Sequence, residues 1–85
     1  MGKDFMKRIV VNPKVMVGKP IIKGTRITVY EIINRVAHGQ TVKEITGDLD
    51  ISKDDVKAAL IYACQLVEGE EIFPTIVGSK HEVSR

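Results

Sequence analysis

The sequence is poor in aromatic residues and in cysteine: its 85 residues include two Tyr, two Phe, no Trp and one Cys. Single-stranded nucleic acids are bound largely by stacking of bases on aromatic side chains, so a stacking platform of that kind is excluded. Cys64 cannot form an internal disulfide, and with only His38 and His81 beside it no zinc-ligand spacing exists. We therefore expect a reducing compartment and neither a metal nor another cofactor.

Long hydrophobic runs are also missing. No apolar run is long enough to cross a membrane, and the N-terminus lacks the apolar core of a signal peptide, so we expect a cytoplasmic protein without a membrane partner. No Ser-His-Asp arrangement is present, and no pair of carboxylates stands at a spacing that would force the two together in an apolar setting. The sequence therefore predicts no enzymatic activity.

Apolar residues at 44% and charged residues at 28% describe one folded domain, whose charge is unevenly distributed. Residues 1–26 carry a net charge of +6, whereas residues 27–85 carry −4. A basic front segment is compatible with contacts to phosphates. Lysines that protect the edges of a strand pair would explain the same charge equally well.

The stretch "GKPIIKGTRIT" predicts a β-hairpin rather than a phosphate-binding loop. Five residues separate Gly18 from Gly24, where a Walker loop needs four, and Thr25-Arg26 stands in place of Lys-Ser/Thr. Residues 8–11 and 20–22 read as short strands, with a possible continuation at 26–28, and the two glycines supply the turns.

Three helices are predicted after the hairpin, and each begins with the same capping pattern. Thr28, Thr41 and Ser52 are each followed three residues later by an acid, the pattern of a capping box. Apolar residues recur behind them at helical spacing. The predicted stripe of the first helix is Ile32, Ile33, Val36 and Ala37, and that helix should end at His38-Gly39. The stripe of the second helix is Val42, Ile45 and Leu49. The stripe of the third helix is Val56, Leu60, Ala63 and Val67, and that helix should end near Gly69.

The second and third helices are joined by about two residues, Asp50 and Ile51. A connection that short, with Ile51 able to fill the corner, is typical of a helix-turn-helix, although a helical corner without any DNA role fits the pattern equally well. We predict a mainly α fold: a three-helix, homeodomain-like helix-turn-helix body with a short N-terminal β-hairpin over residues 1–69, and a C-terminal arm or tail over residues 70–85.

The segments "NPKVMVGKPIIKGTRITVYEII", "GQTVKEI" and "DVKAALIYA" resemble the small bacterial and archaeal family called domain of unknown function 433. The resemblance covers roughly residues 8–67. It implies a helix-turn-helix domain that acts as an antitoxin of VapBC-like toxin-antitoxin pairs, with a PIN-like ribonuclease toxin as its partner. On that basis we expect a homodimer that binds double-stranded DNA as an autorepressor.

The expected recognition helix opens with two lysines and two aspartates, so its first turns have no net charge. Phosphate contacts would then come from the basic front, and such contacts position a protein without reading sequence. The candidate DNA-binding residues are Lys19, Lys23, Arg26, Lys53, Lys57 and Tyr62. A salt bridge from Arg26 to Glu31 is the alternative for that arginine.

The tail supplies a second hypothesis. Ile72, Phe73 and Ile76 are apolar and β-prone, and they either pack back on the front sheet, which we favour, or form a docking arm for another chain. The neutral start of the recognition helix and the acidic run Glu68, Glu70 and Glu71 favour, as the alternative function, a protein-interaction module that does not touch DNA.

Overall fold

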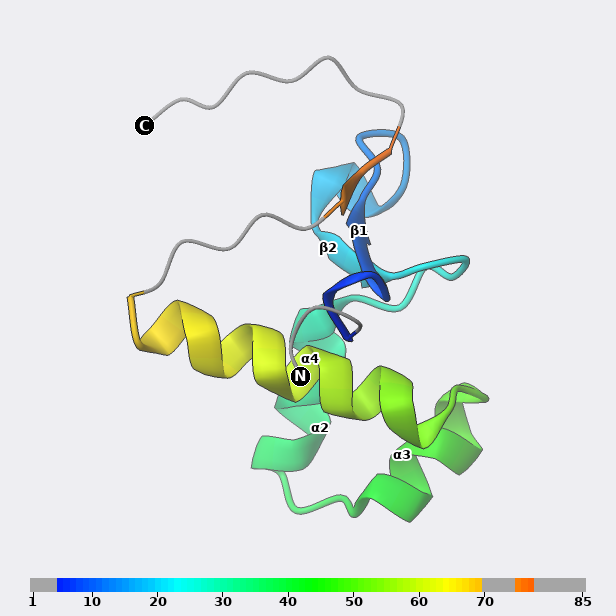
Figure 1. The fold of residues 1–85 in the computed structure, drawn as a ribbon. Helices are drawn as coiled ribbons and strands as arrows, with labels where there is room; N and C mark the ends of the chain where they lie inside the picture. Colours follow the sequence, from blue (N-terminus) through cyan, green and yellow to red (C-terminus); the bar gives the residue numbers. More distant parts are fainter. Residues whose placement is uncertain (1–4, 70–74, 78–85) are drawn as a thin grey trace.

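The computed structural model describes residues 5–69 and 75–77 (Figure 1). The elements in chain order are β1 (Ile9–Val11), the short 3-10 helix η1 (Met16–Gly18), β2 (Pro20–Ile22), α2 (Val29–Ala37), α3 (Val42–Leu49), α4 (Lys53–Val67) and β3 (Thr75–Ile76). A small sheet lies at one end of the molecule, and the long helix α4 runs across α2 and α3 at the other. The predicted mainly α fold with an N-terminal hairpin is confirmed.

The sheet has the strand order β2-β1-β3, with β1 in the centre. β1 and β2 pair antiparallel, and Ile9 lies opposite Ile22. β3 runs parallel to the other edge of β1, where the N–H of Val77 donates to the carbonyl of Val11 at 2.6 Å. This part of the tail therefore packs back on the front sheet, as predicted.

The hairpin has an inner and an outer face because successive strand residues point in opposite directions. Ile9 and Ile22 point into the helical core. Val10 and Ile21 belong to the opposite face and are also buried, at 4% and 3% exposure. The pairing register decides which side chains reach the helical core, because a slip by one residue would exchange every side chain between the two faces.

The three helix starts were predicted from their caps, and all three hydroxyls accept from the expected N–H. Thr41 with Glu44 and Ser52 with Asp55 form complete, reciprocal capping boxes. The box at Thr28 is incomplete, because the carboxylate of Glu31 pairs with Arg35 instead of bonding back. Each cap contributes about 1 kcal/mol to the free energy of unfolding.

The core lies where the inner face of the hairpin meets the three helices. Its residues include Ile9, Ile22, Val29, Ile32, Ile45, Val56, Ala58, Ala59 and Tyr62. The small side chains of Ala58 and Ala59 on α4 allow the neighbouring backbones to approach the helix closely. Ile51 packs against this core from the connection between α3 and α4, as predicted for a residue that fills the corner.

Two predicted stripes are wrong at their C-terminal ends. Val67 is 86% exposed, and Val36 and Ala37 at the end of α2 are exposed as well. The core face of α4 instead passes through Val56, Ala59 and Tyr62. At 15 residues α4 is about 22 Å long, so its last turns extend beyond the helices that could cover them. Among the described residues, no helix is both long and apolar enough to span a membrane.

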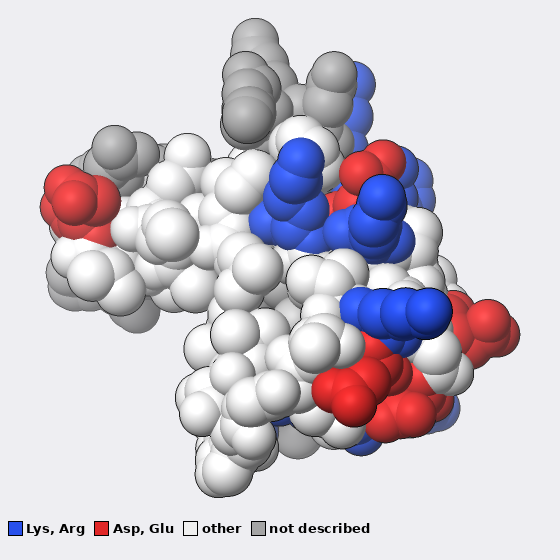
Figure 2. Space-filling view, turned by 90° about the horizontal axis from the view of Figure 1, so that it is seen from below, with Lys and Arg blue, Asp and Glu red and all other residues white. Residues whose placement is uncertain are grey.

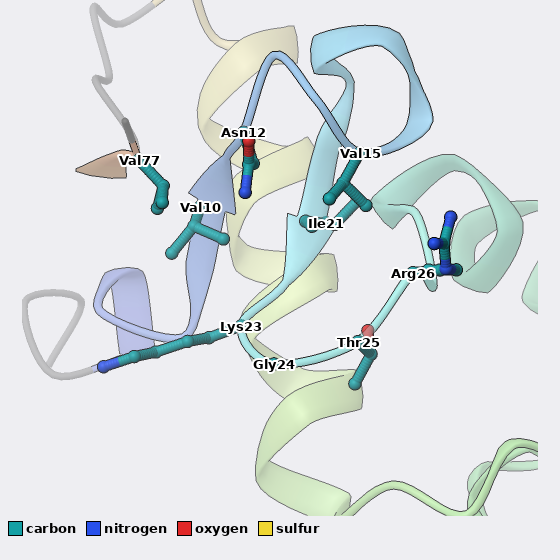
Figure 3. Close-up of a pocket in the computed structure, with 9 residues that line it drawn as sticks. All are labelled: Val10, Asn12, Val15, Ile21, Lys23, Gly24, Thr25, Arg26 and Val77. Atoms are coloured by element: carbon teal, nitrogen blue, oxygen red, sulfur yellow. The ribbon is translucent and has the colours of Figure 1, made fainter. Parts of the chain in front are cut away.

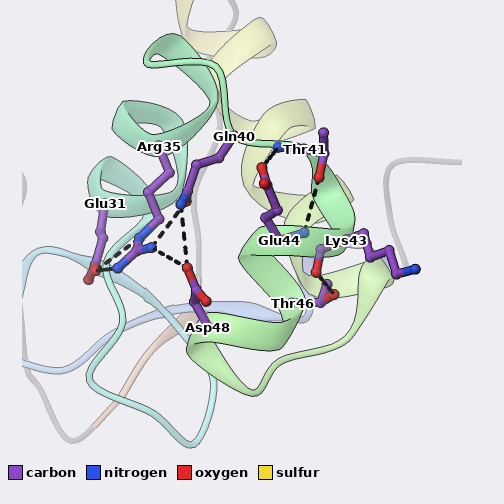
Figure 4. A network of polar contacts seen from close by, with 8 residues as sticks. All are labelled: Glu31, Arg35, Gln40, Thr41, Lys43, Glu44, Thr46 and Asp48. Carbon is purple, nitrogen blue, oxygen red and sulfur yellow. Dashed lines mark hydrogen bonds and ion pairs between the residues drawn. The ribbon is translucent and has the colours of Figure 1, made fainter.

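Arg35 connects α2 to α3 through a polar network (Figure 4). Its guanidinium contacts Glu31 Oε2 at 3.1 Å on its own helix and Asp48 Oδ2 at 3.3 Å on α3. It also donates to Gln40 Oε1 at 3.1 Å in the connecting loop. One planar group thereby holds three segments together, which restrains the angle between the two helices. The predicted alternative pair of Arg26 with Glu31 is wrong, because Glu31 is engaged by Arg35.

The turn at η1 holds three consecutive residues in the left-handed region. Met16, Val17 and Gly18 have φ values of 50°, 56° and 77°. Glycine adopts this conformation freely, but a β-branched residue is strained there. Val17 is also 88% exposed, so burial of its own side chain does little to offset the strain. The surrounding loop must therefore impose this conformation on it.

Candidate nucleic-acid interface

The N-terminal turns of α4 present two lysines to solvent. Ser52 caps the helix, and Lys53 and Lys57 follow at a spacing of four residues, which places them on one side of the helix. Both are exposed, and together with Val42 and Asp54 they line a shallow hollow between α3 and α4. This is the position from which the second helix of a helix-turn-helix enters the major groove.

The two aspartates beside these lysines are paired with an arginine from β1's N-terminal end. Arg8 Nη1 donates to Asp55 Oδ1 at 3.0 Å, and Arg8 Nη2 lies 3.6 Å from Asp54 Oδ2. The other oxygen of Asp55 accepts the N–H of Ser52 in the capping box. Arg8 therefore offsets the negative charge that would otherwise repel phosphates at the start of α4.

Arg8 was not among the predicted site residues. The sequence shows only a basic residue in front of a strand, and pairing over 47 positions has no local signature. The turn formed by residues 5–8 brings a second contact, because Lys57 Nζ lies 5.5 Å from the centre of the Phe5 ring. Phe5 is half-buried against the core but Lys57 is exposed, and a solvent-accessible cation is held over a ring by only about 0.5–1 kcal/mol, which leaves the lysine able to move toward a phosphate.

Lys23 lies next to Arg8, since its N–H donates to the Arg8 carbonyl at 2.8 Å. Lys23 and Arg26 both line a hollow of about 490 Å³ on the outer side of the hairpin (Figure 3). Their side chains extend to opposite sides of it and do not converge on one point. This hollow therefore does not form a single anion site, although each side chain is exposed and free to reach a separate phosphate.

Two of the six predicted DNA contacts lie elsewhere. Lys19 stands at the opposite end of β2 from Lys23, about 13 Å away along the strand at about 3.3 Å per residue. Tyr62 is only 7% exposed and belongs to the core. Burial raises the pKa of its phenol above the ordinary value of 10.0. We therefore remove Tyr62 from the candidate contacts.

The predicted partner-binding arm is described only in part. Ile72 and Phe73 lie outside the described residues. Ile76 lies in β3, whose backbone pairs with β1.

A second surface, not anticipated from the sequence, lies on α2 and α4 and includes Lys19 at the start of β2. It is an apolar hollow of about 280 Å³, lined chiefly by Pro20, Val29, Tyr30, Ile33, Tyr62, Ala63 and Leu66. Tyr30 and Leu66 are 71% and 54% exposed. Figure 2 shows that most charged side chains of the face in view gather on one side, while the middle and the other side carry no Lys, Arg, Asp or Glu apart from an acidic group at the far edge. The sequence signal would have been the surplus of apolar residues at the end of α4.

These observations define a class: a small, mainly α protein with a helix-turn-helix arrangement attached to a three-stranded sheet. Comparison with known proteins gives the family. Residues 9–63 match the family described as "Protein of unknown function (DUF433)", and the chain belongs to it. An uncharacterized protein of Archaeoglobus fulgidus is 75% identical over 24 residues, which are 28% of this chain and 67% of the relative. No solved structure matches the chain.

Proposed function

We propose that this protein is an antitoxin-like regulator that binds double-stranded DNA as a homodimer, represses its own promoter and neutralises a PIN-like ribonuclease in the cytoplasm. The observation that carries the DNA-binding part is the pairing of Arg8 with Asp54 and Asp55. Because Arg8 offsets both carboxylates, the charges that remain at the start of α4 are those of Lys53 and Lys57. Double-stranded DNA attracts such a surface through release of its counterions.

Lys23 extends the basic surface toward the hairpin, because it neighbours Arg8 across the strand pair. The lysines position the helix on the phosphates and do not read the base sequence. Sequence selectivity would come from other exposed residues of the first turns of α4 and from the spacing of two half-sites in a dimer, about one helical turn or a multiple of it.

The test is binding of the purified full chain to labelled duplex from its own upstream region and to a shuffled duplex of equal composition, each over a salt series. We expect selective binding whose affinity falls steeply with salt. Lys53→Ala or Lys23→Ala should reduce the slope of log K against log salt by about one. Lys14→Ala is the matched control, because Lys14 is exposed in the loop at the opposite end of the hairpin.

Weak and equal binding to both duplexes, unaltered by these substitutions, would reject the repressor function. It would favour the second candidate, a protein-interaction module that does not bind DNA. The apolar hollow on α2 and α4 supports that alternative, since exposed apolar patches rimmed by polar residues mark protein interaction sites.

The toxin partner is tested separately by co-expression and co-purification with a PIN-like ribonuclease. Replacing Ile72, Phe73 and Ile76 with Ser distinguishes an arm from a structural strand. Loss of the complex at an unchanged melting temperature would identify a docking arm, whereas a large fall in melting temperature would identify these residues as part of the fold.

A further inference from the structure

The apolar surface of α2 and α4 consists of two adjoining hollows. The first, of about 280 Å³, includes Lys19, Tyr30 and Leu66 in its lining. The second, of about 340 Å³, is lined by Leu60, Cys64, Val67 and Glu68. Ile33 and Ala63 belong to both hollows and therefore lie between them. We refer to the two hollows together as the α2–α4 face.

Large apolar side chains on the α2–α4 face are in contact with water, which is unfavourable for an isolated domain. Tyr30, Leu66 and Val67 are 71%, 54% and 86% exposed. Burying these side chains against a partner would be favourable in proportion to the apolar area removed from water. The total accessible surface is 5868 Å², and a standard interface covers about 800 Å² on each partner, roughly one seventh of it. A face formed from two hollows and the ends of two helices can supply an area of that order.

The charges on the α2–α4 face indicate what covers it. Among the residues that line the two hollows, the charged ones are Lys19 in the first and Glu68 in the second. Each belongs to only one of the two hollows, which meet at the shared residues Ile33 and Ala63. A twofold interface brings one surface patch against itself, so that residue i contacts residue j of the partner and j contacts i. Opposite charges on either side of a common centre satisfy that requirement.

We propose that a second copy of this chain covers the α2–α4 face, with the twofold axis passing near Ile33 and Ala63. The first hollow of one copy then lies against the second hollow of the other, and each Lys19 faces the partner's Glu68. This inference specifies the surface of the proposed homodimer. It rests on the homodimer of the proposed function, and its tests need neither DNA nor toxin. A wild-type monomer would overturn the homodimer and its surface together, whereas a dimer that Leu66→Glu does not weaken would overturn the surface alone.

The first experiment is sedimentation equilibrium of the full chain. The wild-type protein should dimerise, and Leu66→Glu should weaken association at least about tenfold, since it places two carboxylates in a dry interface. Val42→Glu is the matched control, because Val42 is a 39% exposed apolar residue on α3, outside the α2–α4 face. Circular dichroism must show both variants folded. A wild-type monomer, or a dimer that Leu66→Glu does not weaken, would overturn the proposal.

A charge exchange tests the orientation. Lys19→Glu and Glu68→Lys should each weaken the homodimer, because like charges then face each other twice. A mixture of the two variants restores both opposite-charge pairs, so heterodimers should form with at least about tenfold higher affinity than either homodimer. Failure of the mixture to associate more tightly than its components would overturn the twofold arrangement.

Cys64 provides an independent readout. It is an exposed free thiol that lines the second hollow. Its rate of alkylation by iodoacetamide should fall as protein concentration rises in the wild-type protein and stay constant in Leu66→Glu. A rate independent of concentration in a wild-type protein that dimerises would place the interface elsewhere and overturn the assignment.

Discussion

The carboxylate of Asp55 connects two parts of the chain that are 47 positions apart: its Oδ1 accepts from Arg8 Nη1 at 3.0 Å, and its Oδ2 accepts from the N–H of Ser52 at 3.0 Å. The side chain of Asp55 is only 16% exposed. One group thus caps α4 and holds the hairpin against it. This contact attaches α4, the helix that we propose binds DNA, to Arg8 at the start of β1, and Arg8 offsets the negative charge of the helix.

Replacing Asp55 with Ala should lower the free energy of unfolding by about 1–2 kcal/mol, because the cap and the ion pair are lost together. Asp54→Ala is the control. Asp54 is 57% exposed and its pair with Arg8 is longer, at 3.6 Å, so the change should be within about 0.5 kcal/mol. Urea unfolding of the three proteins measures the difference. Equal effects would show that Asp55 has no structural role beyond its charge.

Replacing Arg35 with Lys should cost about 0.5–1.5 kcal/mol although the charge is conserved. A single ammonium cannot contact Glu31, Gln40 and Asp48 in the geometry of the guanidinium (Figure 4). Lys43→Arg, at an exposed position of α3, should leave stability within about 0.5 kcal/mol of wild type. Thermal unfolding compares them, and an unchanged Arg35→Lys variant would refute the bridging role.

Gly47→Ala should raise the free energy of unfolding by up to about 1 kcal/mol. Gly47 lies inside α3, and beyond its own stretch of helix no heavy atom lies within 4 Å of the place where a Cβ would be added. Alanine gains helix propensity there without a clash. Gly39→Ala should have the opposite effect, since Gly39 has a φ of +92°. Stabilisation by both substitutions, or by neither, would contradict this account of the two backbones.

Val17→Asn should also stabilise the fold, by about 1 kcal/mol. Asparagine tolerates the left-handed conformation better than a β-branched residue, and little burial is lost at a position that is 88% exposed. Val15→Asn is the comparison: Val15 has a φ of −123° and lines the hollow beside the hairpin, so this change should not stabilise. A destabilised Val17→Asn variant would mean that the valine side chain makes contacts worth more than its strain.

Tyr62 predicts how stability depends on alkaline pH. Burial raises the pKa of its phenol in the folded protein above the ordinary value of 10.0, so the neutral form is favoured by folding. Its contribution is complete below pH 10 and is lost as pH rises through the higher folded pKa, because the unfolded chain releases the proton first. Tyr62→Phe should reduce the decline in unfolding free energy measured between neutral pH and pH 11. An identical decline in the two proteins would disprove the linkage.

Much of the secondary structure was predictable because its causes are local. The hydroxyl and the acid of each capping box are three residues apart, so their pattern can be read directly from the chain, and all three helices begin where it occurs. The turns at Gly18 and Gly24 were equally predictable, since positive φ favours glycine. Family membership likewise follows from contiguous residues.

The candidate site was predicted only in part. Lys53 and Lys57 lie exposed on one side of α4, as their spacing implied. Lys19 and Tyr62 do not join them: Lys19 lies at the other end of β2 and Tyr62 lies in the core, and neither placement can be read from position along the chain. The helical stripe was misassigned for the same reason: Tyr62 is buried and Val67 exposed, which depends on where the crossing with α2 ends.

What the sequence by itself determined is the N-terminal hairpin, the three helices and the order in which they follow, because capping, turn geometry and periodicity act over a few residues. Only the tertiary structure decided that Arg8 pairs with Asp54 and Asp55, that β3 joins β1, and that α4 extends beyond its neighbours. Those outcomes depend on how the elements are placed relative to one another. Packing of the whole core sets that placement, and no short stretch of sequence encodes it.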